Sequence, residues 1–347
     1  MNIEKMNEAR QRWNMVAKPL HSLGRLEDMV IQIVGITSDS DFSLDKKCVV
    51  VMCADNGVVE MGVTQSESVV TTIVANAMAK NDGNINTIGG LFGADVFPVD
   101  IGMKQEAQDS GVIDRHIRRG TYNIAKGPAM TREECLAAIN VGIDMVKTVT
   151  EKGYKIIATG EMGIGNTTTS SAIAAVLLNK TVEEVTGKGA GLTSDGLNRK
   201  IEVIKLALEK NNVCDRGNMN DYDFAVNLLS KVGGFEIAGM VGLFLGGAIY
   251  KVPVVIDGFI SAVAAAIAKL MDNNSVNYML PSHVSKEPAG KWMLEFVGLE
   301  PVINADMCLG EGTGAVMIFP MLDAALSLYK STHKFDNLEI EAYEELI

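Results

Sequence analysis

The chain has 347 residues, and its 31 lysines and arginines stand against 43 aspartates and glutamates, which gives a formal net charge of −12. This acidic balance argues against a general nucleic-acid binder, because such a protein needs a positive face that displaces the counterions of phosphates. A hydrophobic content of 47% with 34 glycines is typical of a well-packed globular protein and excludes a disordered or fibrous chain.

Five cysteines form an odd set without a C-x-x-C pair, and no apolar leader follows a basic start. These features disfavour a disulfide scaffold, a zinc knuckle and secretion. The four histidines show no metal-ligand spacing. We therefore expect a reduced, cytoplasmic protein with no metal site and no membrane segment.

The predicted elements begin with residues 2–35, whose apolar residues recur every three or four positions and favour helix. Four short apolar runs then predict buried strands, and the segments between them have helical periodicity. The strands are expected at 47–53, 95–101, 155–158 and 252–256, and the helices at 69–80, 131–152, 168–179 and 199–210.

Two later segments, 237–250 and 260–271, are apolar almost all round and predict buried helices. The first is too short to span a bilayer, which needs about 20 residues, and its glycines would allow a neighbouring helix or strand to approach closely. Residues 320–329 predict a last helix.

Alternating buried strands and helices predict an α/β fold: a mostly parallel, Rossmann-like sheet covered by helices on both faces. We expect this catalytic domain over residues 36–319. The helical chain ends, residues 1–35 and 320–347, are expected to pack together as a small helical domain.

Glycine beside an acidic or hydroxyl residue follows each of the four predicted strands, and two further stretches of polar or glycine residues come later in the chain. In open parallel sheets, ligands bind at the carboxyl ends of the strands, so this repetition predicts one assembled site, although a single Asp-Gly pair is an ordinary turn. The stretches are Asp55-Asn-Gly57, Asp100-Ile-Gly102, Thr159 to Asn166, Asp257-Gly-Phe259, Pro281-Ser-His283 and Leu309 to Gly314.

The segment Thr159-Gly-Glu-Met-Gly-Ile-Gly-Asn-Thr-Thr-Thr-Ser170 is typical of a strand-to-helix loop. A helix N-terminus behind glycines favours a phosphate, although helix capping with glycine turns explains the same residues. The spacing fits neither the P-loop nor the dinucleotide fingerprint. The candidate phosphate-binding residues are Gly163, Gly165, Asn166, Thr167 and Thr168.

Lys200 lies where an amphipathic helix is predicted to start, after the glycine-rich stretch 187–192. A lysine there opposes the helix dipole, and a bound anion would offset that cost. The alternative is a solvated surface lysine.

Glu311 lies between Gly310 and Gly312, and a carboxylate in such a glycine-lined cleft is a candidate general base. A loop glutamate in water is the alternative. Among the histidines, His283 is the plausible site-lining residue.

Several stretches together match one known enzyme family. They are Lys18-Pro-Leu-x-Ser22-Leu-Gly-x-Leu26-Glu27, Ala54-Asp-Asn-Gly-Val58, Thr159-Gly-Glu-Met-Gly-Ile-Gly-Asn-Thr-Thr168, Val255-Ile-Asp-Gly-Phe259 and Leu309-Gly-Glu-Gly-Thr-Gly-Ala315. In this order, over nearly the whole chain, they resemble nicotinate-nucleotide-dimethylbenzimidazole phosphoribosyltransferase, which makes the lower-ligand nucleotide of cobalamin.

The resemblance implies transfer of a phosphoribosyl group from nicotinate mononucleotide to a ring nitrogen of a benzimidazole, with inversion at the anomeric carbon and release of nicotinate. It implies Glu311 as general base and Glu161 as the carboxylate that stabilises positive charge or binds the ribose. The glycine loop becomes the 5′-phosphate cradle with Lys200 beside it, and Asp257 with Gly258 contacts the donor. The resemblance further implies a homodimer, and the scheme requires no cofactor.

One position departs from the family pattern. Where the family carries a glutamine beside the acceptor base, this chain has Ile73 in Val70-Thr-Thr-Ile73. The acceptor could therefore be another benzimidazole, a purine or a phenol.

Three other functions compete with this assignment. A Rossmann oxidoreductase would need G-x-G-x-x-G after the first strand, where the chain reads Ala54-Asp-Asn-Gly-Val58. A non-catalytic mononucleotide-binding regulator predicts loss of the carboxylates, yet Glu161 and Glu311 are present. A transferase that uses phosphoribosyl pyrophosphate would need an acidic pair before the hydroxyl cluster.

Overall fold

A computed structural model describes residues 1–189, 191–214, 216–331 and 333–343. Its centre is one six-stranded sheet in which every pair of neighbouring strands is parallel, in the order β3-β2-β1-β4-β5-β6. This is the strand order of doubly wound dinucleotide-binding folds, so the predicted class is confirmed. The strands are β1 (Lys47–Ala54), β2 (Ala94–Gly102), β3 (Ile113–Asp114), β4 (Ile156–Met162), β5 (Val254–Ile256) and β6 (Met279–Pro281).

The central strand β1 is buried along its whole length and serves two cores. Cys48, Val50 and Met52 belong to one apolar cluster, whereas Val49 and Val51 belong to another. Side chains alternate between the faces of a strand, so each cluster fills one side of the sheet. A continuous apolar run is the pattern that such a strand requires.

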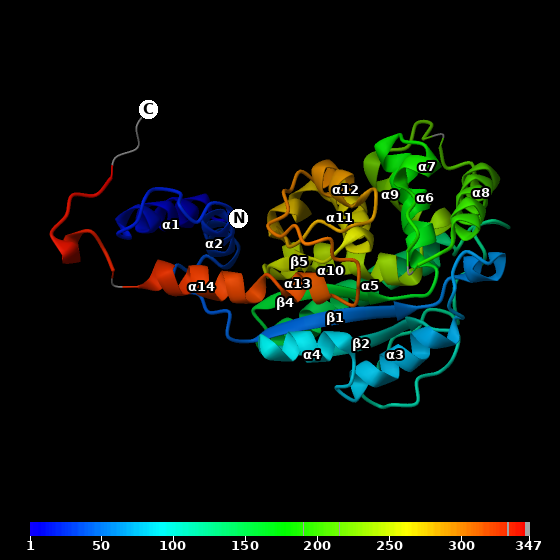
Figure 1. Cartoon of the computed structure of the whole chain (residues 1–347), viewed down its shortest axis with the longest axis horizontal. Helices are drawn as coiled ribbons and strands as arrows, with labels where there is room; N and C mark the ends of the chain where they lie inside the picture. Colours follow the sequence, from blue (N-terminus) through cyan, green and yellow to red (C-terminus); the bar gives the residue numbers. More distant parts are fainter. Residues whose placement is uncertain (190, 215, 332, 344–347) are drawn as a thin grey trace.

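Helices cover both faces, as predicted. One group packs in the first cluster and lies above the sheet in Figure 1: α5 (Arg132–Glu151), α6 (Asn166–Leu178), α7 (Val182–Val185), α8 (Ser194–Asn211), α9 (Asp221–Val232), α10 (Phe235–Tyr250), α11 (Phe259–Met271) and α12 (Gly290–Val297). The other cluster contains α1 (Ile3–Met15), α2 (Arg25–Thr37), α3 (Val69–Ala79), α4 (Asn84–Leu91), α13 (Thr313–Val316) and α14 (Phe319–Lys330). Short 3₁₀ turns are η1 (Gly57–Met61), η2 (Asn273–Tyr278) and η3 (Asp336–Leu338).

Helices α5 and α10 cross with their backbones in contact. A Cβ atom added to Gly142 would stand 2.0 Å from the carbonyl oxygen of Gly239, and one added to Gly242 would stand 1.9 Å from that of Ile139. The glycines of α10 therefore admit a neighbouring helix, as predicted. Most of the apolar side chains of α10 are buried by this packing. The exposed ones, Ile249 and Tyr250, lie in its last turn. Among the described residues, no helix combines the length and hydropathy that a bilayer crossing requires.

The helices from the two chain ends lie side by side, at the left of Figure 1. Trp13 of α1 and Tyr329 of α14 pack in a tilted arrangement with ring centroids 5.2 Å apart and an interplanar angle of 55°, and Arg12 Nε donates to the Tyr329 carbonyl. Their apolar residues share a cluster with Val49 of β1. The division into domains 36–319 and 1–35 with 320–347 stays a prediction, and residues 344–347 lie outside the described part of the chain.

Candidate active site

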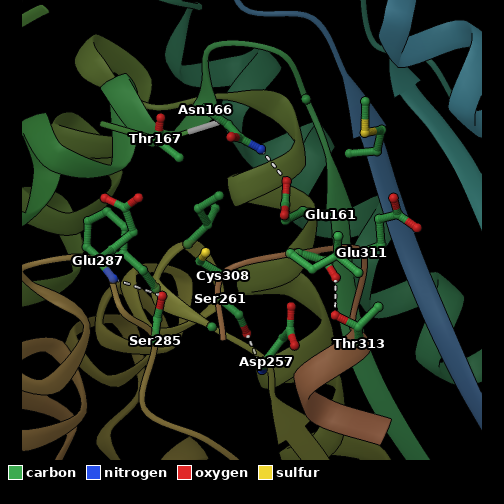
Figure 2. A pocket seen from close by; sticks show the side chains of 18 of the residues that line it. Glu161, Asn166, Thr167, Asp257, Ser261, Ser285, Glu287, Cys308, Glu311 and Thr313 are labelled. Atoms are coloured by element: carbon green, nitrogen blue, oxygen red, sulfur yellow. Dashed lines mark hydrogen bonds between the residues drawn. The ribbon is translucent and has the colours of Figure 1, made fainter. Parts of the chain in front are cut away.

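A cavity of about 270 Å³ lies at the carboxyl ends of β4, β5 and β6 (Figure 2). It adjoins the point where the strand order reverses between β1 and β4, which is where open α/β sheets bind ligands. Four of the predicted strand-end stretches converge on it. The lining residues with polar or charged side chains are Glu161, Asn166, Thr167, Asp257, Ser261, His283, Ser285, Glu287, Glu311 and Thr313.

Glu161 stands near the end of β4 with its side chain buried. Its carboxylate accepts a hydrogen bond from Asn166 Nδ2 (Figure 2) and lies against Gly310, where a Cβ atom would come within 2.6 Å of Glu161 Oε1. Burial, reinforced by the nearby charge of Asp257, raises the pKa of Glu161 to about 8. At neutral pH this group is therefore largely protonated, and a cation brought beside it would favour its ionised form.

Glu311 occupies a left-handed backbone conformation with φ 61°, between Gly310 at φ 87° and Gly312 at φ 89°. Only glycine adopts this region without strain, so the flanking glycines let the chain turn while Glu311 carries the cost. The Glu311 carboxylate accepts hydrogen bonds from Asn84 Nδ2 at 3.0 Å and the Ile85 backbone N–H at 3.2 Å. Both donors belong to the N-terminus of α4, where a negative charge is favoured.

Asp257 holds the Glu311 loop from behind. Its Oδ2 accepts the Gly312 N–H at 3.2 Å and its Oδ1 accepts the Ala315 N–H at 2.9 Å, so the carboxylate caps the short helix α13. Burial raises the pKa of Asp257, against the opposing effect of the neighbouring His283. The His283 ring lies so close to Gly314 that a Cβ atom there would come within 2.0 Å of it. Asp257 therefore has a structural task that the sequence did not indicate.

Lys200 lies inside α8 rather than at its start, which corrects the sequence prediction. The helix begins at Ser194 because the Thr193 side chain caps it by accepting the Gly196 N–H at 3.1 Å. Lys200 is fully buried, so the helix-dipole argument and the surface alternative both fail. Its Nζ donates to Thr167 Oγ1 at 2.8 Å and to the Gly187 carbonyl at 3.2 Å. Both acceptors are uncharged, which leaves the ammonium a third hydrogen for an anion.

Burial lowers the pKa of Lys200 to about 8. A second cavity of about 80 Å³ contains Lys200 and shares the wall formed by the glycine-rich loop with the first. Gly163, Asn166 and Thr167 line both cavities, while Gly165, at φ 93°, lines the smaller one and precedes α6.

Not every predicted residue reaches the cavity wall. Thr168 is fully buried inside α6, and Gly312 packs against Val49 of β1, so both lie behind the wall. Ile73 is 58% exposed, and its neighbour Val74 lines the cavity instead. The wall at α3 is therefore apolar because of Val74, and Ile73 does not define it. By contrast, Gly258 and Gly310 line the cavity as predicted.

Several lining or supporting residues were not predicted. Asn84 contacts Glu311 from a helix that begins 227 residues earlier in the chain, and no local motif marks it. Ser285 and Glu287 follow the three-residue strand β6, and Met307 and Cys308 have no nearby strand in the sequence. The stretch Pro281-Ser-His283, which the sequence did single out, lies just before Ser285 and marks this part of the wall.

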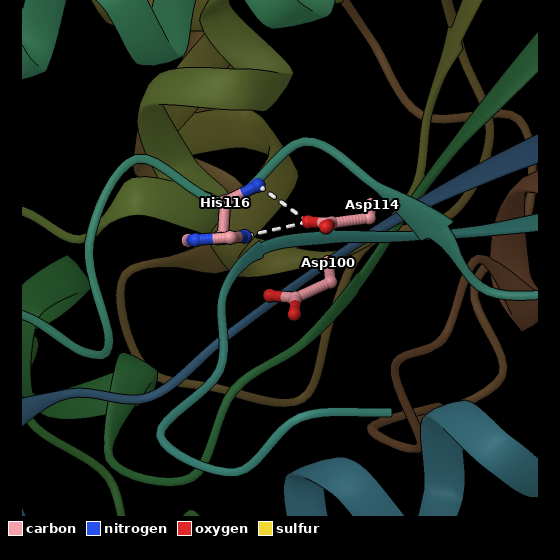
Figure 3. Close-up of side chains that lie close together, drawn as sticks. All are labelled: Asp100, Asp114 and His116. Atoms are coloured by element: carbon pink, nitrogen blue, oxygen red, sulfur yellow. Dashed lines mark hydrogen bonds and ion pairs between the residues drawn. The ribbon is translucent and has the colours of Figure 1, made fainter. Parts of the chain in front are cut away.

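A cluster of Asp100, Asp114 and His116 lies apart from the cavity, at the ends of β2 and β3 (Figure 3). Its charges are already matched. Asp114 Oδ1 is 2.6 Å from His116 Nδ1, and Asp100 Oδ2 pairs with Arg119 at 2.7 Å. Arg119 already pairs with the Asp100 oxygen that a metal ion would need as a ligand. The cluster therefore gives no reason to revise the expectation that the protein has no metal site.

A family model described as "Phosphoribosyltransferase" matches residues 1–340. The chain is 45% identical to a nicotinate-nucleotide–dimethylbenzimidazole phosphoribosyltransferase of Acetivibrio thermocellus over 98% of this chain and 95% of that protein. It is 46% identical to the protein of that name from Ruminiclostridium cellulolyticum, over 100% and 96% of the two chains. The crystal structure of CobT from Thermus thermophilus superposes with a TM-score of 0.90 at 32% identity, covering 97% of this chain and 99% of that one. With full-length similarity in both sequence and structure, the chain belongs to the nicotinate-nucleotide–dimethylbenzimidazole phosphoribosyltransferase family.

Proposed function

We propose that this protein transfers the 5-phosphoribosyl group from nicotinate mononucleotide to a ring nitrogen of 5,6-dimethylbenzimidazole or a related base. The products are α-ribazole 5′-phosphate and nicotinate, in assembly of the cobalamin lower-ligand nucleotide. The observation that carries the proposal is one cavity in which the carboxylates of Glu161 and Glu311, two of the four that line it, lie beside a glycine-rich loop backed by the buried Lys200.

The donor's phosphate binds at the loop formed by Gly163, Gly165, Asn166 and Thr167. The positive end of the α6 dipole lies there, and glycines allow close approach. Lys200 adds the positive charge that a protein of net charge −12 must supply locally. With the phosphate in the smaller cavity, the ribose and nicotinate extend into the larger one, toward Asp257 and Gly258.

Glu161 stabilises the reacting sugar. The donor carries a cationic pyridinium, and as its C–N bond breaks the electron pair passes to the ring nitrogen, so nicotinate leaves without a strong acid. Positive charge then moves onto the sugar in an oxocarbenium-like state, which a nearby carboxylate stabilises. Burial raises the pKa of Glu161 to about 8, and the cationic donor lowers it again, so the ionised form arises when it is needed.

Glu311 is the proposed base. As the acceptor nitrogen bonds to the anomeric carbon on the face opposite nicotinate, the proton of the other ring nitrogen must leave, and Glu311 takes it. Asn84 and Ile85 orient the carboxylate from the far side of the loop, which leaves lone pairs for the acceptor.

The test combines an acceptor panel with one substitution. Purified protein is incubated with nicotinate mononucleotide and dimethylbenzimidazole, benzimidazole, adenine or p-cresol, and nicotinate and the new nucleotide are measured by mass spectrometry. Release of nicotinate that depends on a benzimidazole supports the proposal, and a preference for adenine or p-cresol would transfer it to a different acceptor. Donor binding without product from any acceptor would favour the non-catalytic regulator.

Glu311→Gln removes the proton acceptor but keeps the shape of the side chain. We expect kcat to fall about 10²- to 10⁴-fold while donor binding changes little. Glu295→Gln, on the exposed side of α12, is the matched control and should behave as the parent. Turnover of Glu311→Gln within a few-fold of the parent would assign the proton to another group.

Two further properties follow from the resemblance. We propose a homodimer, which light scattering of the purified protein would test; a monomeric mass would reject it. Most of helix α10 is buried within one chain, so only its exposed last turn, with Ile249 and Tyr250, could contribute to an interface. We also propose a cytoplasmic location, because all five cysteines are free, as suits a reducing compartment. Cell fractionation would test it.

A further inference from the structure

A buried pair of polar side chains lies behind the glycine-rich loop and has no part in the scheme above. Asn56 follows β1, and Glu236 stands in the first turn of α10, 180 residues later. Both are fully buried. Asn56 Nδ2 donates to Glu236 Oε1 at 2.8 Å.

The remaining oxygen of each side chain has no hydrogen-bond partner. Asn56 Oδ1 and Glu236 Oε2 are both buried and unpaired. They also converge, because a Cβ atom placed on Gly234 would stand 2.7 Å from Asn56 Oδ1 and 2.6 Å from each Glu236 oxygen. Two buried acceptors to which the protein offers no donor are unfavourable, whereas one proton between them would satisfy both.

We propose that Glu236 is held as the neutral acid, its O–H donating to Asn56 Oδ1 while the Asn56 amide donates back to Oε1, and that this reciprocal pair positions the glycine-rich loop. Glu236 is thus a positioning residue, acting through the loop rather than on substrate.

The pair forms the back of the loop. A Cβ atom on Gly163 would stand 3.1 Å from Glu236 Oε1, and one on Gly165 would stand 3.4 Å from Asn56 Cβ. An ionised Glu236 would therefore place a negative charge directly behind the proposed phosphate site and repel the ligand. The neutral acid supports the loop without that repulsion.

The charges around Glu236 favour its neutral form. Burial raises the pKa of Glu236 to about 7, against the opposing effect of the hydrogen bonds from Asn56 and from its own backbone N–H, and the charge of Asp55, beyond β1, acts in the same direction as burial. Glu161 on β4 is a further carboxyl group within electrostatic reach. The cation Arg118 stands over the ring of Phe235, the residue before Glu236, at 5.6 Å and pairs with Glu134.

Glu236→Gln is the informative variant, because an amide can donate to Asn56 Oδ1 and accept from Asn56 Nδ2 at any pH. We expect its KM for nicotinate mononucleotide to match the parent within about twofold at pH 6. Between pH 6 and 8 the parent's KM should rise more than that of Glu236→Gln, because only the parent acquires the charge. An equal rise in both, or a KM about tenfold above the parent at pH 6, would overturn the proposal.

Infrared spectroscopy tests the pair without activity. The parent at pH 6 should show a hydrogen-bonded carboxylic-acid C=O stretch that is missing in Glu236→Gln and retained in Glu161→Gln, which removes the other raised glutamate. Should Glu236→Gln not fold, Asn56→Leu leaves the acid without its acceptor and should move its band to the frequency of a free acid. A parent spectrum without such a band, or a band whose frequency is unchanged in Asn56→Leu, would overturn the proposal.

The role of the loop rests on the proposed function, whereas the shared proton is a property of the folded chain. An acid band with the expected response but no use of the mononucleotide would reject the proposed function and leave the pair standing. Normal catalysis with no acid band would do the reverse.

Discussion

Lys200 is a buried ammonium whose two hydrogen-bond partners are uncharged. The nearby charge of Glu287 offsets only part of the burial, because the pKa of Lys200 is still lowered to about 8, so a bound anion would compensate it further. We expect Lys200→Met, which fills similar space without charge, to raise KM for the mononucleotide more than it lowers kcat. Lys210→Met, in the exposed last turn of α8, is the control. An unchanged KM for Lys200→Met would remove Lys200 from the phosphate site.

Because burial lowers the pKa of Lys200 to about 8, the free protein loses this charge as the pH rises above 8. Donor affinity should therefore weaken in that range in the parent and not in Lys200→Met. Measured KM between pH 7 and 9 separates the two proteins, and parallel profiles would show that another group titrates.

Substitution of Asp257 tests whether this residue fixes the Glu311 loop or contacts the donor. Its two oxygens accept the N–H groups of Gly312 and Ala315, and Asp257→Asn would turn an NH₂ group toward one of these donors. If Asp257 acts by fixing the Glu311 loop, kcat falls and KM changes little. A rise in KM with kcat preserved would instead place Asp257 on the donor, as the family resemblance implies.

At the scale of elements, the sequence predicts what repeats over enough residues. The runs that became β1 and β2 are long, apolar and β-branched, and α10 and α11 are apolar all round, so burial alone defines them. The strands β3 and β6 were missed because two or three residues carry no periodicity. The equally short β5 was found because it belongs to the longer apolar run 252–256. The start of α8 was placed late because Thr193 caps it through a single side-chain contact that an apolar pattern does not register.

The contact between α5 and α10 depends on glycines, whose lack of a side chain lets the two backbones touch. We expect Gly142→Ala to destabilise the protein by about 1–3 kcal/mol, because the new methyl group overlaps the backbone of α10 and the helices must separate. Gly90→Ala, on the exposed side of α4 with open space around it, should instead stabilise by about 0.5–1 kcal/mol. Urea unfolding measures both, and equal effects would mean that the helices yield easily.

At the scale of the molecule, the site is assembled from segments that local patterns cannot connect. The glycine motifs indicated which loops line the cavity, because parallel strands bring their carboxyl ends to one edge. They did not indicate that Asn84 would hold Glu311 or that Glu236 would face Asn56, because these contacts depend on how whole helices dock on the sheet. The sequence therefore predicted the loops that line the cavity better than the residues that support them.

The buried carboxyl groups of the site also govern the stability of the whole molecule. The pKa of Glu161 is raised from 4.5 to about 8 and that of Glu236 from 4.5 to about 7, so between those values the folded chain binds more protons than the unfolded one. The contribution of these two groups to the free energy of unfolding is fully present below pH 4.5. It falls as the pH rises toward 8, by at most about 1.4 kcal/mol per pH unit for each group. Lys200 acts at higher pH and in the opposite direction. Its pKa is lowered to about 8, so the folded chain recovers stability as the pH rises from 8 toward 10.5.

We expect the unfolding free energy to decline between pH 5 and 8, and to decline less steeply in Glu161→Gln and Glu236→Gln, with Glu295→Gln unchanged from the parent. A profile in which the two site variants keep the parent's slope would show that neither carboxyl group holds its proton in the folded protein.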